Sequence, residues 1–77
     1  MIAITMPKIS HYVTEGLVTQ WYKKEGDHVR EGELLLEIET IKATTDIEAP
    51  GPGTLVRILV QEGEFAKCET LLAEIEA

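Results

Sequence analysis

The chain has 77 residues, a formal net charge of −7 at pH 7 and a single cysteine. This length allows one domain, close to the lower limit at which a single hydrophobic core holds a chain folded. The charge argues against nucleic acid and anionic membrane as partners, and one cysteine excludes an internal disulfide.

Short β-prone segments follow one another along the whole chain, separated by turns that Gly, Pro and Asp signal. Nothing in the sequence predicts a helix of ten residues or more. We therefore expect an all-β domain. In chain order the predicted strands are residues 2–6, residues 17–22 opened by Gly16, a short strand around Val29, the two arms of a hairpin over 36–48, residues 55–60 and residues 71–75.

The hairpin carries the clearest pattern, because apolar and acidic residues alternate on both of its arms. With Ile41 and Lys42 as the two-residue tip, the apolar faces match in two pairs, Ile38 with Thr45 and Leu36 with Ile47. A primed turn would need positive φ at Ile41, which is costly for a β-branched residue, so we expect a type I turn.

The chain also repeats itself with a shift of 37 residues. Such a repeat predicts two similar β units that pack on each other, since neither can bury its apolar face alone. We expect a flattened barrel or sandwich with a quasi-twofold axis. The matching segments are Gly16 with Gly53, Glu25-Gly26 with Glu62-Gly63, Leu34-Leu35 with Leu71-Leu72, and Glu37-Ile38-Glu39 with Glu74-Ile75-Glu76.

No group of residues predicts an enzyme active site: there is no nucleophile with an evident base, no metal-ligand cluster and no phosphate loop. Lys42 stands out because its counterpart in the repeat, Thr5, precedes the matching segments. A lysine at a hairpin tip is usually a solvated turn residue; the alternative is an amine held out for use. The acidic outer face beneath it either keeps the strands soluble or docks a modifying enzyme. Its members are Glu37, Glu39, Asp46 and Glu48.

A series of short motifs then gives the sequence a family resemblance. They are Met6-Pro7-Lys8, Glu15-Gly16, Trp21, Lys24-Glu25-Gly26-Asp27-His28-Val29, Gly32, Glu37-Ile38-Glu39-Thr40, Lys42-Ala43, Glu48-Ala49-Pro50, Gly53, Ile58, Glu62-Gly63 and Leu72-Ala73. In order and spacing the chain closely resembles the lipoyl domains of 2-oxo acid dehydrogenase dihydrolipoamide acyltransferases, in the biotinyl/lipoyl attachment domain family. Residues 1–77 are therefore expected to be one lipoyl domain.

The resemblance implies a flattened eight-stranded barrel of two four-stranded antiparallel sheets, and lipoic acid joined by an amide to Lys42. A lipoate ligase would attach the cofactor. In this family a thiamine-diphosphate 2-oxo acid decarboxylase reductively acylates the dithiolane, the acyltransferase core passes the acyl group to coenzyme A, and dihydrolipoamide dehydrogenase reoxidises the dithiol. By this resemblance we expect the domain itself to be a swinging-arm carrier that catalyses none of these steps.

The resemblance also suggests which residues discriminate between partners. The candidates flank the lysine or lie in the loop that is near the arm in this family: Glu39, Thr40, Ile41, Ala43, His11, Tyr12 and Val13. Ile41 stands where these acyltransferases usually have Asp, so we expect lipoate attachment to survive and recognition by the decarboxylase to change.

A second departure from the family pattern lies in the second unit of the repeat. Glu69 stands where a Gly matching Gly32 is common. We expect this difference to alter only a turn.

Three other functions remain open. A biotinyl carrier has the same fold, but methionines normally flank its lysine, whereas Ile41 and Ala43 flank Lys42. A glycine-cleavage carrier also holds lipoate after a Val- or Ile-like residue, but it is longer and has helices. An unmodified docking domain is the third. Within the lipoyl family, the residues after Lys42, Ala43-Thr44 and Asp46-Ile47-Glu48-Ala49, favour the pyruvate or acetoin type.

The sequence lacks targeting signals. No apolar run approaches the roughly 20 residues that span a bilayer, and residues 1–5 lack the basic region and long apolar segment of a signal peptide. We expect a cytoplasmic, monomeric domain. The chain stops at Ala77, where an acyltransferase would begin an Ala/Pro-rich linker, so we expect either an excised domain or a free-standing carrier.

Overall fold

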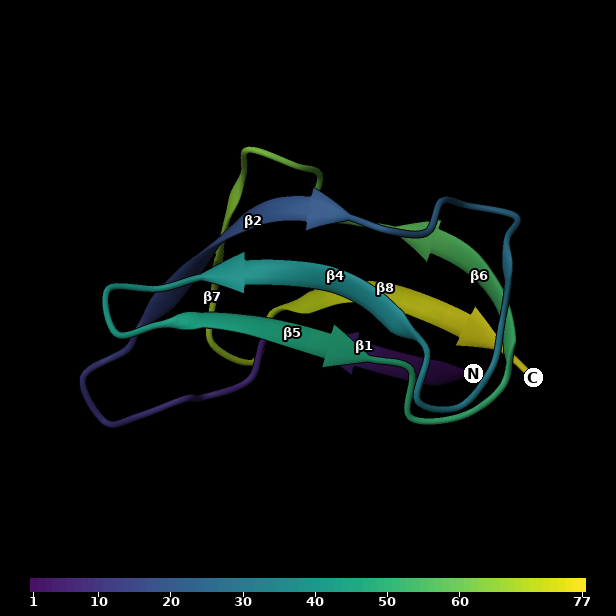
Figure 1. The fold of residues 1–77 in the computed structure, drawn as a ribbon, viewed down its shortest axis with the longest axis horizontal. Coiled ribbons are helices and arrows are strands. Elements are labelled where there is room, and N and C mark those ends of the chain that lie inside the picture. Colours follow the sequence, from purple (N-terminus) through teal and green to yellow (C-terminus); the bar gives the residue numbers. More distant parts are fainter.

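The computed structural model describes residues 1–77, which form eight strands and no helix. In chain order these are β1 (Ile2–Thr5), β2 (Glu15–Trp21), β3 (His28–Val29), β4 (Leu34–Glu39), β5 (Thr44–Glu48), β6 (Gly53–Ile58), β7 (Phe65–Lys67) and β8 (Leu71–Glu76). They build two four-stranded antiparallel sheets, with strand orders β1-β8-β6-β3 and β5-β4-β2-β7 (Figure 1). The predicted all-β fold is confirmed. The structure contains no helix capable of crossing a membrane.

One strand, β7, was not predicted from the residues themselves. It is three residues long, too short to show an alternating pattern, and it follows directly after the turn at 62–64. Its identity as a strand comes from pairing with β2, in which Leu17 lies opposite Phe65 and Gly16 opposite Ala66. That pairing joins segments almost fifty residues apart, which local pattern cannot reveal.

The hydrophobic core lies between the two sheets, because each strand points alternate residues inward. In β4 and β8 the inward residues Ile38 and Ile75, which are 37 positions apart, are both fully buried. Each fully buried aliphatic side chain contributes about 1.5–3 kcal/mol to folding. The core cluster consists of Ile4, Met6, Val18, Val29, Leu35, Leu36, Ile38, Ala49, Leu55, Val60, Ala66, Leu72, Ala73 and Ile75.

The sequence repeat appears in the structure as a quasi-twofold relation between the sheets. The strands β2, β3 and β4 correspond to β6, β7 and β8, and β5 takes the place in its sheet that β1 takes in the other. Hydrogen bonds repeat as well: the amide of Trp21 donates to the Glu62 carboxylate over 2.7 Å, and the amide of Ile58 donates to that of Glu25 over 2.8 Å. Each unit thus supplies a carboxylate to the other, and the predicted symmetry is confirmed.

Two features that break the symmetry lie at the same end of the molecule. The connection from β1 to β2 covers residues 6–14, whereas its counterpart from β5 to β6 covers only residues 49–52. Figure 1 shows the longer loop and the β4–β5 turn together at one end of the long axis, and both termini at the other. The quasi-twofold axis places the termini where a second such turn would lie. The β4–β5 turn therefore has no counterpart in the other sheet.

Glu69 does not alter its turn, contrary to expectation. Its backbone adopts φ of +71°, close to the +83° of Gly32. Its amide donates to the Met6 carbonyl over 2.8 Å, as the Gly32 amide donates to the Ala49 carbonyl over 2.8 Å. The turn is preserved, and Glu69 adopts a left-handed conformation that costs a non-glycine residue about 1 kcal/mol.

Candidate functional site

The β4–β5 hairpin holds Lys42 in the register that the sequence predicts. The pairs Leu36 with Ile47 and Ile38 with Thr45 lie opposite each other, and the strands end at the pair of Glu39 with Thr44. The four residues 40–43 connect them. The apolar sides of both arms face the core, and this burial fixes the register that presents Lys42 at the tip.

Thr40 closes the turn. Its amide donates to the Ala43 carbonyl over 2.9 Å, and its hydroxyl donates to the same carbonyl over 3.0 Å. The hydroxyl oxygen also accepts from the amides of Lys42 and Ala43, each over 3.2 Å. Neither Ile41 nor Lys42 has positive φ, which excludes the primed hairpin turns and agrees with the expected type I geometry. Thr40 was predicted to recognise partners, and the structure gives its hydroxyl a role in shaping the tip.

A Thr40→Val variant tests that role, since it keeps the side-chain shape and removes the hydroxyl. We expect the free energy of unfolding to fall by about 1 kcal/mol, and the amides of Lys42 and Ala43 to exchange hydrogen about five times faster. Hydrogen exchange followed by NMR measures both sites. Thr44→Val is the control, because Thr44 is exposed on β5 and its hydroxyl makes no hydrogen bond. Equal exchange rates in the two variants would contradict the role of the hydroxyl.

The amine of Lys42 is free. Lys42 and Ala43 are exposed, and Ile41 is 90% exposed. The ion pairs of the structure join Lys23 to Glu33 and Arg57 to Glu74, and Lys42 takes part in neither. A lysine without an ionic partner on a hydrogen-bonded turn combines a mobile nucleophile with a fixed position.

The predicted acidic face lies along the outer side of the hairpin. Glu39, Asp46 and Glu48 are exposed, while Glu37 is half-buried and accepts a hydrogen bond from the Thr19 hydroxyl over 2.9 Å. The acidic face also affects the neighbouring Tyr22. Partial desolvation raises the pKa of the Tyr22 hydroxyl, and the negative charges of Glu37 and Asp46 raise this pKa further.

The three loop residues predicted to discriminate partners divide into two kinds. His11 is exposed and Tyr12 is 80% exposed. Both belong to the loop over residues 6–14, which Figure 1 shows at the same end of the molecule as the β4–β5 turn. Val13 is only 2% exposed, and its carbonyl accepts a hydrogen bond from the Cys68 thiol over 3.2 Å. The prediction for Val13 is therefore wrong for its side chain, which is buried, while its carbonyl ties the loop to Cys68.

The sequence reasoning missed a shallow groove of about 240 Å³ beside the tip. Its apolar residues come from three places: Leu17 from β2, Phe65 from β7 and Ile41 from the turn. Glu15, Glu39 and Thr40 complete its lining. Phe65 is 64% exposed, and it joins this group only through the pairing of β7 with β2. A lone aromatic residue directly after a turn was the available signal in the sequence.

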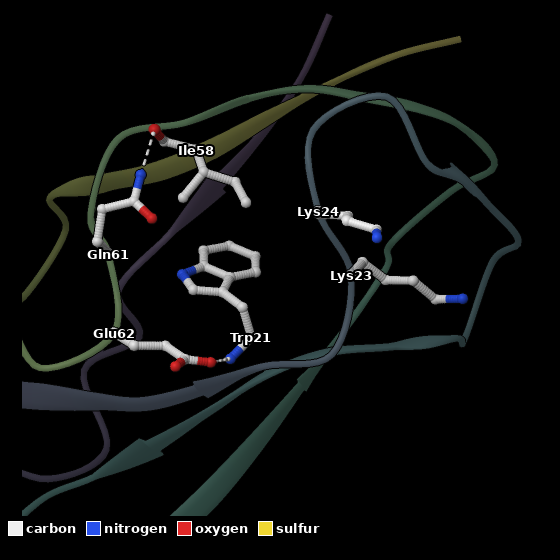
Figure 2. A pocket seen from close by; sticks show the side chains of 6 residues that line it. All are labelled: Trp21, Lys23, Lys24, Ile58, Gln61 and Glu62. Carbon is white, nitrogen blue, oxygen red and sulfur yellow. Dashed lines mark hydrogen bonds between the residues drawn. The ribbon is translucent and has the colours of Figure 1, made fainter.

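A second and larger depression, of about 410 Å³, shares no lining residue with the groove at the tip and is lined by residues of both repeat units (Figure 2). Its base is formed by Trp21 and Ile58, which are counterparts in the repeat. The indole N–H donates to the Val60 carbonyl over 2.8 Å, which anchors the ring between the two units. Figure 2 shows the amines of Lys23 and Lys24 pointing away from the indole. No group of three His, Cys, Asp or Glu side chains that could hold a metal exists in the structure.

Comparison with known proteins identifies the family to which this chain is similar. The family described as "Biotin-requiring enzyme", of biotin- and lipoyl-binding domains, matches residues 2–75. The dihydrolipoyllysine-residue acetyltransferase component of the pyruvate dehydrogenase complex of Rhizobium meliloti is 44% identical over 99% of this chain and 17% of its own length. The dihydrolipoyllysine-residue succinyltransferase component of the 2-oxoglutarate dehydrogenase complex of Rickettsia bellii is 45% identical over 80% of this chain and 16% of its own length.

A solved structure agrees with these relatives. The lipoyl domain of the 2-oxoglutarate dehydrogenase complex of Azotobacter vinelandii superposes with a TM-score of 0.85 at 30% identity, covering 100% of this chain and 98% of that domain. The chain spans only about a sixth of the length of the two enzyme components above, 17% and 16%. The likeness is thus to one domain of those components.

Proposed function

Since this chain belongs to the biotinyl/lipoyl attachment domain family, we propose that it is a lipoyl carrier domain with lipoic acid joined by an amide to Nζ of Lys42. The observation that carries the proposal is the tip itself. Lys42 is exposed, has no ionic partner, and occupies the one hairpin turn that the quasi-twofold repeat leaves without a counterpart.

The residues present fit such a group. The Thr40 hydroxyl holds the turn, so the amine projects from a fixed point at the end of the 33 Å long axis. Amide formation removes the ammonium charge, and the exposed Ile41 and Ala43 leave room on both sides of the lysine. When bound, lipoic acid supplies a dithiolane that accepts an acyl group and returns to its oxidised form after the group has left. The chain contributes position and mobility rather than catalysis.

The partners follow from the proposed role. We infer that a lipoate ligase modifies Lys42, that a thiamine-diphosphate 2-oxo acid decarboxylase loads the arm, and that an acyltransferase core and dihydrolipoamide dehydrogenase complete the cycle in the cytoplasm. The relatives include components of both pyruvate and 2-oxoglutarate complexes. The residues that follow Lys42 favour the pyruvate or acetoin type. Exposed Glu39, Ile41, His11 and Tyr12 are the candidates for contact with the decarboxylase.

Biotin is the second candidate cofactor, because the matching family includes biotin-requiring enzymes. The decisive experiment is the intact mass of the protein after incubation with lipoate, ATP and a lipoate ligase, with biotin and its ligase in parallel. We expect a lipoyl-sized increment and no biotinyl increment. A biotinyl increment alone would transfer the chain to the carboxylases, and no increment from either ligase would favour an unmodified docking domain.

Ile41 offers a test of partner recognition. Ile41→Asp restores the carboxylate usual in the acyltransferases, and at 90% exposure the change leaves the core untouched. With a pyruvate-type decarboxylase we expect kcat/KM for acylation of the lipoylated domain to rise about threefold to tenfold, since a charge at the rim of an interface mainly changes the association rate. Ile41→Asn is the matched control that adds polarity without charge. An unchanged rate in Ile41→Asp would refute the role of position 41.

A further inference from the structure

We propose that the groove formed by Leu17, Phe65 and Ile41 is the resting site of the dithiolane ring when the arm on Lys42 is idle. This inference rests on the proposed function, because it requires a lipoyl group on Lys42. The tethered ring would then have a specific binding site on the domain, instead of moving freely in solvent.

The groove presents apolar side chains that the fold does not bury. Leu17 lies opposite Phe65 on one side and opposite Glu39 on the other, so the three residues form a row across β7, β2 and β4. The inward residues of this part of β2 are Gly16 and Val18, which are buried, and Leu17 therefore faces outward. Phe65 is 64% exposed and Ile41 is 90% exposed. A small apolar ring would remove part of this surface from water.

The length of the arm matches the distance to the groove. Ile41 is the neighbour of Lys42, and Phe65 lies two strands away from β4, or about 10 Å at the usual strand spacing. Eleven bonds separate the lysine Cα from the dithiolane ring. At about 3.4 Å for every three bonds of an extended chain, this arm reaches about 12 Å. Lys42 also lies three residues beyond Glu39, which is the β4 end of this row. The ring can therefore lie over Ile41 and Leu17 without any movement of the backbone, and it reaches Phe65 when the arm is nearly extended.

The quasi-twofold symmetry supplies an internal comparison. The counterparts of Leu17 and Phe65 are Thr54 and His28, which also lie opposite each other at the other end of the molecule. That pair borders Glu76, as Leu17 borders Glu39. The same backbone framework thus carries a polar pair near the termini and an apolar pair near Lys42. Stability of the barrel does not demand the apolar pair, and its restriction to the lysine end points to the arm.

Because the dithiolane ring is tethered to Lys42, a weak contact is enough to keep it in the groove. A tethered group experiences a local concentration in the millimolar range, so a ring with only modest affinity occupies the groove for much of the time. The amide bond between Lys42 and lipoic acid also removes the positive charge of the lysine. The arm can then cross the row from Glu39 to Leu17 without placing an ammonium over apolar side chains.

The test uses the lipoylated protein and a variant that copies the other end of the barrel, Leu17→Thr with Phe65→His. In the wild type we expect NMR cross-relaxation between the Phe65 ring and dithiolane protons. We also expect reduction of the dithiolane by a small phosphine to be about twofold to fivefold faster in the variant, because a ring that is shielded for half to four-fifths of the time reacts in proportion to its free fraction. Val56→Thr, at a 37% exposed position of β6, is the control and should reduce at the wild-type rate.

The outcomes separate the two proposals. A lipoyl increment on Lys42 with no cross-relaxation, or with equal reduction rates in all three proteins, overturns the resting site and leaves the carrier function intact. The absence of a lipoyl mass increment overturns the carrier function, and it overturns the resting site as well, because that site requires the lipoyl group. Thermal unfolding of the unmodified variant separates a local effect from misfolding; a variant that does not fold removes the rate comparison, and the cross-relaxation in the wild type then decides alone.

Discussion

Replacement of Lys42 by alanine is expected to abolish lipoyl attachment completely, with no change in the fold. The side chain of Lys42 makes no hydrogen bond or ion pair, and the turn is closed by the hydroxyl and amide of Thr40, which the substitution leaves in place. The free energy of unfolding, measured by thermal denaturation, should therefore stay within about 0.5 kcal/mol of the wild-type value. Intact mass after incubation with the ligase measures the modification.

Two further variants show whether the amine or merely its charge is needed. Lys42→Arg keeps the positive charge but lacks the primary amine, and it should also remain unmodified. Lys24→Ala is the matched control, since Lys24 is likewise exposed in a turn, between β2 and β3. This control should be modified to completion. An increment on Lys42→Ala would show that another lysine is the acceptor and that the tip has been wrongly assigned.

The largest loss of stability is expected for Gly53→Ala. A Cβ atom at Gly53 would overlap the carbonyl oxygen of Glu76 and approach Cγ2 of Ile75 to 2.7 Å. The backbone of β8 cannot retreat, because Thr54 pairs with Glu76 and Leu55 with Ile75. We expect a loss of about 3 kcal/mol. At about 0.05–0.15 kcal/mol per residue, a domain of this size has only about 4–12 kcal/mol in total.

Urea unfolding measures this loss, and Gly32→Ala provides the comparison. Gly32 has φ of +83° and nothing within 4 Å of a built Cβ, so its substitution tests backbone conformation without steric overlap. We expect Gly32→Ala to cost about 1–2 kcal/mol, less than Gly53→Ala. If the two variants lost equal stability, close packing against β8 would not be the reason for glycine at position 53.

The sequence was sufficient for the features that repeat or alternate locally. Alternation along residues 36–48 predicted the pairs Leu36 with Ile47 and Ile38 with Thr45, because only one register buries both apolar faces. The 37-residue repeat predicted two β units related by a quasi-twofold axis. It also set Lys42 apart, since that residue lies outside the matching segments.

Tertiary structure decided what depends on contacts between distant segments. Strand β7 exists because Phe65–Lys67 pair with β2, and three residues carry no periodic signal of their own. The same pairing places Phe65 beside Leu17 and so creates the groove near Lys42. Val13, in a loop whose sequence is uninformative, is buried by the barrel, while its neighbour Tyr12 is not. Local pattern determines which face of a strand is apolar, but burial and grooves arise only when separate strands are brought together.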